Sequence, residues 1–99
     1  MVTLKNILKD NDYANSGVIV YNLAKDVITN GEKVIIDMEG VDSVPTNFMN
    51  TSFGMLIEEF GIDVTKKSFI FRNILKSQVE RISKYFRDYQ TLIEKLANK

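Results

Sequence analysis

The order of apolar and polar positions along the chain predicts alternating strands and helices. Residues 2–8 place polar side chains between apolar ones, which is typical of an edge strand covered on one face. From Val20 to Ile28 the apolar residues recur at helical spacing, and Gly31 follows as a residue that ends a helix with a positive φ. The first third of the chain therefore predicts a strand followed by an amphipathic helix.

The middle of the chain repeats this order. Residues 33–38 contain three consecutive apolar residues, Val34, Ile35 and Ile36, which are followed by the acidic Asp37 and by Met38. A strand that is apolar on both faces is expected to be covered on both. A loop with Gly40 and Pro45 follows. A second helix is then predicted, with Gly61 at its end, from the one-sided apolar residues Met49, Phe53, Leu56, Ile57 and Phe60.

The last third predicts a short strand at residues 68–72 and a helix over about residues 74–97. The β-α-β-α-β-α order predicts one small two-layer α/β domain over residues 1–99, with three mainly parallel strands and helices packed on the sheet. The last helix would be roughly 33 Å long. Its final turns are therefore expected either to fold back on the core or fray, or to extend beyond it and meet a second molecule.

Composition narrows the possible chemistry. The 99 residues contain no Cys and no His, which excludes disulfides, thiolate metal sites and His-based catalytic triads. No apolar run approaches the roughly 20 residues that span a bilayer, and the first residues lack a signal-peptide core, so a cytosolic protein without a membrane partner is expected. Lys76, Arg81, Lys84 and Arg87 scatter around the last helix, which gives no basis for binding nucleic acid.

Three kinds of function fit these elements. Phe48, Ser52 and Met55 share a helical edge turned about 100° from the core stripe, which indicates either a protein-binding patch or a wide core face. Strand-end carboxylates at Asp10, Asp12 and Asp37 suit a small Mg²⁺-dependent enzyme that binds phosphate or a nucleotide. A third possibility is a structural homodimer, in which the last helices of two copies pack against each other.

Thr46 lies where the second helix is expected to begin, directly after Pro45. A hydroxyl at this position is either an ordinary N-cap that accepts a helix amide, or an exposed group open to phosphorylation or anion binding. Both interpretations stay open on the residues alone.

The central stretch VIIDMEGVDSVPTNFMNTSFGMLIEEFG resembles the STAS-like domain family, a bacterial group similar to STAS and anti-sigma factor antagonist domains. The resemblance covers roughly residues 16–90, including KKSFIFRN. The positions that carry it are Asp37, Gly40, Val41, Phe48, Phe53, Gly54 and Leu56. It implies an α/β fold and a regulatory role without catalysis or a cofactor.

In the antagonists, an Asp-Ser-Ser-Gly motif follows this strand, and a partner kinase of the GHKL ATPase type phosphorylates its first Ser. The corresponding residues here are Pro45, Thr46, Asn47 and Phe48, so Thr46 keeps a hydroxyl while the Asp and the Gly are replaced. The resemblance therefore favours a contact surface over a phosphorylation switch. The expected function is a protein-interaction module that binds its partner through the loop and helix at residues 43–59, with Thr46, Asn47, Phe48, Ser52 and Met55 as contacts.

Overall fold

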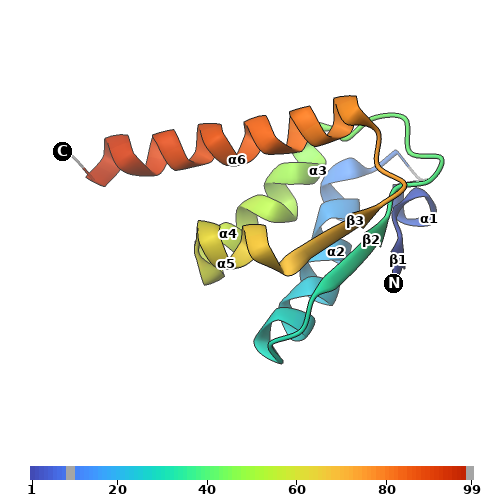
Figure 1. Cartoon of the computed structure of the whole chain (residues 1–99), viewed down its shortest axis with the longest axis horizontal. Coiled ribbons are helices and arrows are strands. Elements are labelled where there is room, and N and C mark those ends of the chain that lie inside the picture. Colours follow the sequence, from blue (N-terminus) through green and yellow to red (C-terminus); the bar gives the residue numbers. More distant parts are fainter. Residues whose placement is uncertain (9–10, 98–99) are drawn as a thin grey trace.

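A computed structural model describes residues 1–8 and 11–97 of the chain. Its centre is a three-stranded parallel sheet in the order β1 (Val2–Thr3), β2 (Val34–Asp37), β3 (Phe69–Arg72). The central strand pairs with both neighbours, so the shorter β1 is an edge strand (Figure 1). This arrangement confirms the predicted α/β class with parallel strands and helices packed against them.

Six helices connect and follow these strands in the described residues. They are α1 (Leu4–Leu8), α2 (Tyr13–Thr29), α3 (Thr46–Thr51), α4 (Phe53–Phe60), α5 (Ile62–Ser68) and α6 (Lys76–Ala97). The prediction of a strand over residues 2–8 is wrong after Thr3, where α1 begins. Leu4, Ile7 and Leu8 have the i, i+3, i+4 spacing of one helix face, and all three pack into the core.

Within residues 1–8 and 11–97, the helices cover one face of the sheet and leave the other partly exposed. Val34 and Ile36 of β2 are buried, whereas Ile35 between them is partly exposed. Its partner across the pair, Ile70 of β3, is 42% exposed. The predicted burial of both faces is therefore wrong. Buried residues of α2, α3, α4 and α6 belong to the same core as Val34 and Ile36 of the covered face. The apolar Ile35 and Ile70 lie opposite each other on the other face.

Phe53, at the start of α4, is the centre of the core. Its ring is 1% exposed and makes edge-on contacts with Phe48 and with Phe69 and Phe71 of β3, at centroid distances of 6.3, 5.1 and 6.2 Å. It also contacts Phe86 of α6 at 5.5 Å. One side chain thus joins α3, β3 and α6, and such aromatic pairs add stability beyond the area they bury.

The predicted helix over residues 46–60 is two helices, because the chain breaks at Ser52. There φ is −110° and ψ is −83°, and the buried hydroxyl of Ser52 donates to the Phe48 carbonyl at 2.8 Å. A serine that bonds back to the carbonyl four residues earlier competes with the helical ladder and bends helices. The direction of α3 is therefore independent of α4, and wheel positions do not carry across residue 52.

The long α6 passes over the sheet and continues past α4 and α5 (Figure 1). Ile82 and Phe86 are buried in the core, while residues 91–97 are exposed. The molecule measures 42 Å along its longest axis, and the Cα radius of gyration is 13.1 Å. Residues 91–97 of α6 therefore do not fold back on the core, and the expectation that they would is wrong.

Candidate functional site

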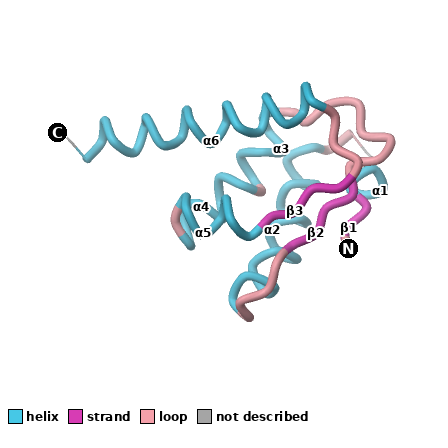
Figure 2. Tube along the Cα trace, in the orientation of Figure 1, coloured by secondary structure: helices cyan, strands magenta, loops and turns pink. Residues whose placement is uncertain are grey.

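The loop between β2 and α3 (residues 38–45) is held in place by α6. Val41 and Val44 bury their side chains in the core, and their carbonyls accept hydrogen bonds from Gln78 and Arg81 of α6. This loop and the β3–α6 loop lie at the same end of the sheet, where all strands have their carboxyl ends (Figure 2). Ligands and partners of parallel sheets commonly bind at this end.

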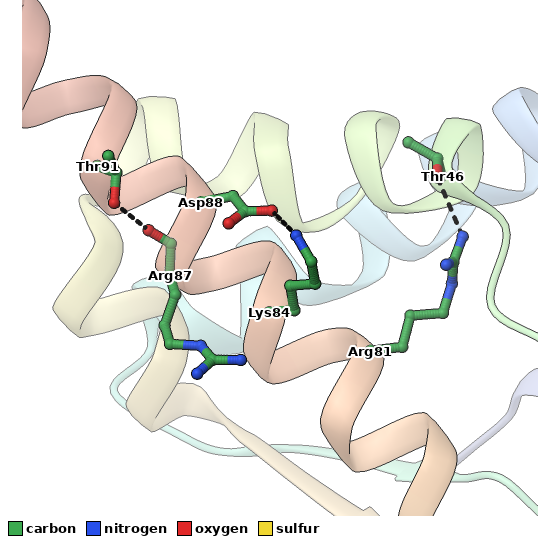
Figure 3. Close-up of polar contacts among 6 residues, drawn as sticks. All are labelled: Thr46, Arg81, Lys84, Arg87, Asp88 and Thr91. Carbon is green, nitrogen blue, oxygen red and sulfur yellow. Dashed lines mark hydrogen bonds and ion pairs between the residues drawn. The ribbon is translucent and has the colours of Figure 1, made fainter.

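Thr46 is the first residue of α3, and its hydroxyl faces α6. The N-cap position belongs to Pro45, which has extended backbone and makes no capping side-chain bond, so the interpretation of Thr46 as N-cap is wrong. Figure 3 shows that the Arg81 guanidinium reaches from α6 to Thr46, donating to its hydroxyl oxygen from Nη2 at 3.0 Å. Thr46 is exposed at this contact.

The structure separates the five predicted contact residues into two groups. Thr46 and Asn47 are exposed, and Met55 is 42% exposed on α4. Phe48 and Ser52 are 1% and 0% exposed, so their predicted place on a contact surface is wrong. The break at Ser52 turns Phe48 into the core against Phe53, and the Ser52 hydroxyl is used inside the chain.

A shallow groove runs between α3 and α6. Its lining consists of Thr46, Met49, Arg81, Lys84, Tyr85 and Asp88. The Tyr85 hydroxyl donates to Asn50 of α3 at 3.0 Å, and burial together with nearby Tyr89 and Glu58 raises the Tyr85 pKa to about 12. Lys84 and Asp88 form an exposed ion pair at 2.6 Å, and such pairs contribute about 0–1 kcal/mol to stability. The hydrogen bond from Tyr85 to Asn50 joins α6 to α3 along this side of the groove.

Comparison with known protein families identifies a family model that matches more than half of the chain. The family model described as a STAS-like domain of unknown function (DUF4325) matches residues 16–78. The chain belongs to this STAS-like family. The match runs from the start of α2 to the start of α6, so it includes the β2–α3 loop, α3 and α4. No curated protein and no solved structure matched the chain.

The contact of Arg81 with the β2–α3 loop was not predicted from the sequence. Arg81 and Lys84 are spaced three residues apart among other charged positions of α6, and the sequence placed them on its outer surface. The structure shows that Arg81 instead contacts the loop and Thr46. Only the three-dimensional pairing of α6 with the β2–α3 loop could have revealed this role.

The acidic residues proposed as metal ligands have other local partners. Asp12 is the N-cap of α2 and accepts from the Asn15 amide at 3.2 Å. Asp37 accepts from the Asn73 side chain at 3.0 Å and from the Glu39 amide at 3.1 Å. Asp10 lies outside the described residues. Within residues 1–8 and 11–97, no group of three or more acidic side chains lies close enough together to hold a metal ion.

No helix within residues 1–8 and 11–97 combines the length and apolar character that crossing a bilayer requires. This holds for α6 although it is the longest helix, because its charged residues recur along its length.

The pKa of Asp37 provides a test of this loop geometry. Hydrogen bonds from Asn73 and from the Glu39 amide, together with the Arg72 charge, lower the pKa of Asp37 below its ordinary value of 3.8. In Asn73→Gly, which keeps the positive φ of 55° without strain, the Asp37 pKa is expected to rise toward its ordinary value. NMR titration of the Asp37 carboxyl in both proteins measures the change.

The sign of the linked stability change follows from this direction. Because the folded-state pKa is lowered, ionised Asp37 stabilises the fold above its ordinary pKa, and this contribution is lost as the pH falls through the lowered value. The stability difference between wild type and Asn73→Gly should therefore shrink below about pH 4. An Asp37 pKa that is the same in both proteins would contradict the hydrogen bond.

Proposed function

We propose that this STAS-like domain is a non-enzymatic regulatory module that binds a protein partner through the exposed residues Thr46, Asn47, Asn50 and Met55, called here the α3–α4 surface. The observation that carries the proposal is the pair of hydrogen bonds from Arg81 to the Val44 carbonyl and the Thr46 hydroxyl. They hold an exposed loop and helix start in one conformation. A surface that is ordered before binding loses less conformational entropy when a partner docks.

Exposed apolar area adjoins the ordered loop. Met55 is 42% exposed, and at helical spacing it shares a face of α4 with Glu59, four residues later, which contacts α2. There the Tyr21 hydroxyl donates to Glu59 at 2.9 Å, and the Thr51 hydroxyl donates to the Ala14 carbonyl at 2.7 Å, so α2 runs alongside α3 and α4. Val18, which is 41% exposed, lies between Ala14 and Tyr21 in the sequence of α2, at i+4 from Ala14 and i−3 from Tyr21. Methionine adapts to varied partner shapes, which suits this position to a protein contact.

Local hydrogen bonding supports a binding role over the metal-dependent alternative. Asp12 and Asp37 are occupied by helix capping and by the Asn73 contact. Both interactions stabilise the fold around the loop and leave the carboxylates facing different partners. The chemistry that the described part of the site offers is thus recognition by polar and apolar contacts.

The partner proposed from the family likeness is an ATPase or kinase of the GHKL type. Thr46 is the proposed modification site, since its exposed hydroxyl lies 3.0 Å from the Arg81 guanidinium, with Lys84 in the same groove. A phosphate on Thr46 would replace one neutral acceptor by several charged ones and pair with these cations. It would thereby change the charge of the α3–α4 surface without breaking the core.

Partner capture with paired variants tests the proposed surface. Wild type, Met55→Glu and Ile70→Glu serve as baits in an extract of the source organism, and captured proteins are quantified by mass spectrometry. Ile70 is the matched control because it is also 42% exposed but lies on the open face of the sheet. A partner retained by wild type and Ile70→Glu is expected to fall about tenfold or more with Met55→Glu, as at an interface hot spot.

Two results would count against the proposal. Equal loss with Ile70→Glu and Met55→Glu would move the interface away from the α3–α4 surface, and equal retention with both would do the same. The captured kinase, incubated with ATP, should add the mass of one phosphate to wild type and none to Thr46→Val. Phosphate on both proteins would exclude Thr46 as the site.

A further inference from the structure

Strand β3 has a free edge. Within residues 1–8 and 11–97 the strand order is β1-β2-β3, so β2 is the only strand that pairs with β3. The Arg72 carbonyl accepts from the Met38 amide at 2.8 Å, which directs the main-chain groups of Arg72 toward β2. Successive residues of a paired strand direct their N–H and C=O groups to opposite sides, so those of Phe71 face the free edge. Such an edge is a template for a further strand.

A groove of about 470 Å³ lies between this edge and α6. Phe69 and Phe71 of β3 line one side of it, and Val79, Ser83 and Arg87 of α6 line the other. These three residues of α6 are spaced four apart, so they form one stripe along the helix. Val79 is 44% exposed, and the middle residue of the stripe, Ser83, has a small side chain. The groove therefore offers space for side chains beside a main chain that can pair with a strand (Figure 1).

The charge of the edge disfavours pairing with a second copy of the chain. Residues 66–72 contain Lys66, Lys67 and Arg72 and no acidic residue. Edge-to-edge pairing of two copies would bring these positive charges together, and like charges on neighbouring strands are destabilising. The edge is therefore suited to a strand of a different sequence.

The charges of the groove indicate what that sequence contains. Lys66 and Arg87 lie at the same end of the groove, since both also line a neighbouring hollow together with Asp63. In the described part of the chain, neither cation forms an ion pair. The acidic residue of the groove lining, Glu80, is seven residues from Arg87, or about 10 Å along α6. An occupant with a carboxylate at the end near Lys66 and Arg87 thus complements the groove.

We infer that β3 binds an extended segment of a protein partner as a fourth strand. The segment has apolar side chains at alternate positions, which enter the groove beside α6, and an Asp or Glu that pairs with Lys66 and Arg87. Strand addition gains affinity from main-chain hydrogen bonds and specificity from pockets for alternate side chains. This site goes beyond the proposed function, because it shares no residue with the α3–α4 surface.

Selection from a phage-displayed library of random short peptides tests the site, with the whole chain as the target. Enriched peptides should alternate apolar residues and contain Asp or Glu. Their affinity, measured by fluorescence polarisation, should fall about tenfold or more with Ser83→Trp, which fills the groove, and with Arg87→Glu. Thr91→Trp is the matched control and should bind as wild type does, because Thr91 is exposed on the same helix and does not line the groove. Both Trp variants replace exposed residues, so circular dichroism should show an unchanged fold.

N-methylation of single amides in an enriched peptide provides the second readout. Affinity should fall about tenfold at every second amide only, because only those amides face β3. Failure to enrich any peptide, equal affinity for wild type and Ser83→Trp, or an equal loss at successive amides would overturn strand addition. Enriched peptides that lose affinity with Met55→Glu but not with Ser83→Trp would place binding on the α3–α4 surface and overturn the β3 site. The two proposals therefore fail independently.

Discussion

Phe53→Ala is expected to lower the free energy of unfolding by about 3–5 kcal/mol, which is the range for removing a buried aromatic side chain. The Phe53 ring contacts four other phenylalanine rings from α3, β3 and α6. Its loss leaves a cavity at the point where these elements meet, and the surrounding backbone can close only part of it. Urea unfolding followed by circular dichroism measures the change.

Phe71→Ala is the matched control for this prediction. Phe71 belongs to the same aromatic cluster but is partly exposed at β3. Its loss should cost clearly less, because solvent already reaches the side chain and less area is uncovered. Equal destabilisation by the two substitutions would show that Phe53 is not the centre of the core.

Gly17→Ala is expected to destabilise the protein by about 1–3 kcal/mol or more, although alanine is the better helix former. A Cβ at position 17 would lie 1.9 Å from the Thr51 Oγ1 and 2.5 Å from the Phe48 carbonyl oxygen. A threonine can rotate, but the carbonyl belongs to the α3 backbone. Helices α2 and α3 would therefore have to move apart at this contact, which positions α3.

Asn22→Ala on the exposed side of α2 is the control for helix propensity. It should leave the urea midpoint unchanged or raise it slightly, while Gly17→Ala lowers the midpoint. A rise in the midpoint for Gly17→Ala would contradict the close approach of α2 and α3, since only the propensity gain would then remain.

The order of elements and the parallel sheet follow from local patterns that the structure preserves. Gly31 has the positive φ expected at the end of α2, and the apolar run before Asp37 forms the central strand. The observed secondary structure differs from the prediction in short segments, where few residues decide between a helix and a strand. The helical spacing of Leu4, Ile7 and Leu8 competes with a strand pattern over the same short segment. Helix α5 was not predicted, because its sequence has no apolar stripe on one face. Its buried residues Thr65 and Ser68 are polar, and their hydroxyls donate to the carbonyls four residues earlier.

The candidate site was predictable only in part, for a specific physical reason. Helical periodicity placed Phe48 and Met55 on one edge, and this inference assumes a continuous helix between them. The backbone break at Ser52 removes that assumption, so Met55 stays exposed while Phe48 packs on Phe53. The contribution of Arg81 depends on α6 crossing the β2–α3 loop, a long-range contact that no local pattern encodes.

Hydrogen exchange of the domain alone and in complex with its captured partner tests the central proposal most directly. Amides in residues 43–59 are expected to exchange more slowly in the complex, with the largest effect around Thr46, Asn47 and Met55, and β3 should change little. Slower exchange confined to β3 or to the end of α6, with residues 43–59 unchanged, would contradict binding through the α3–α4 surface.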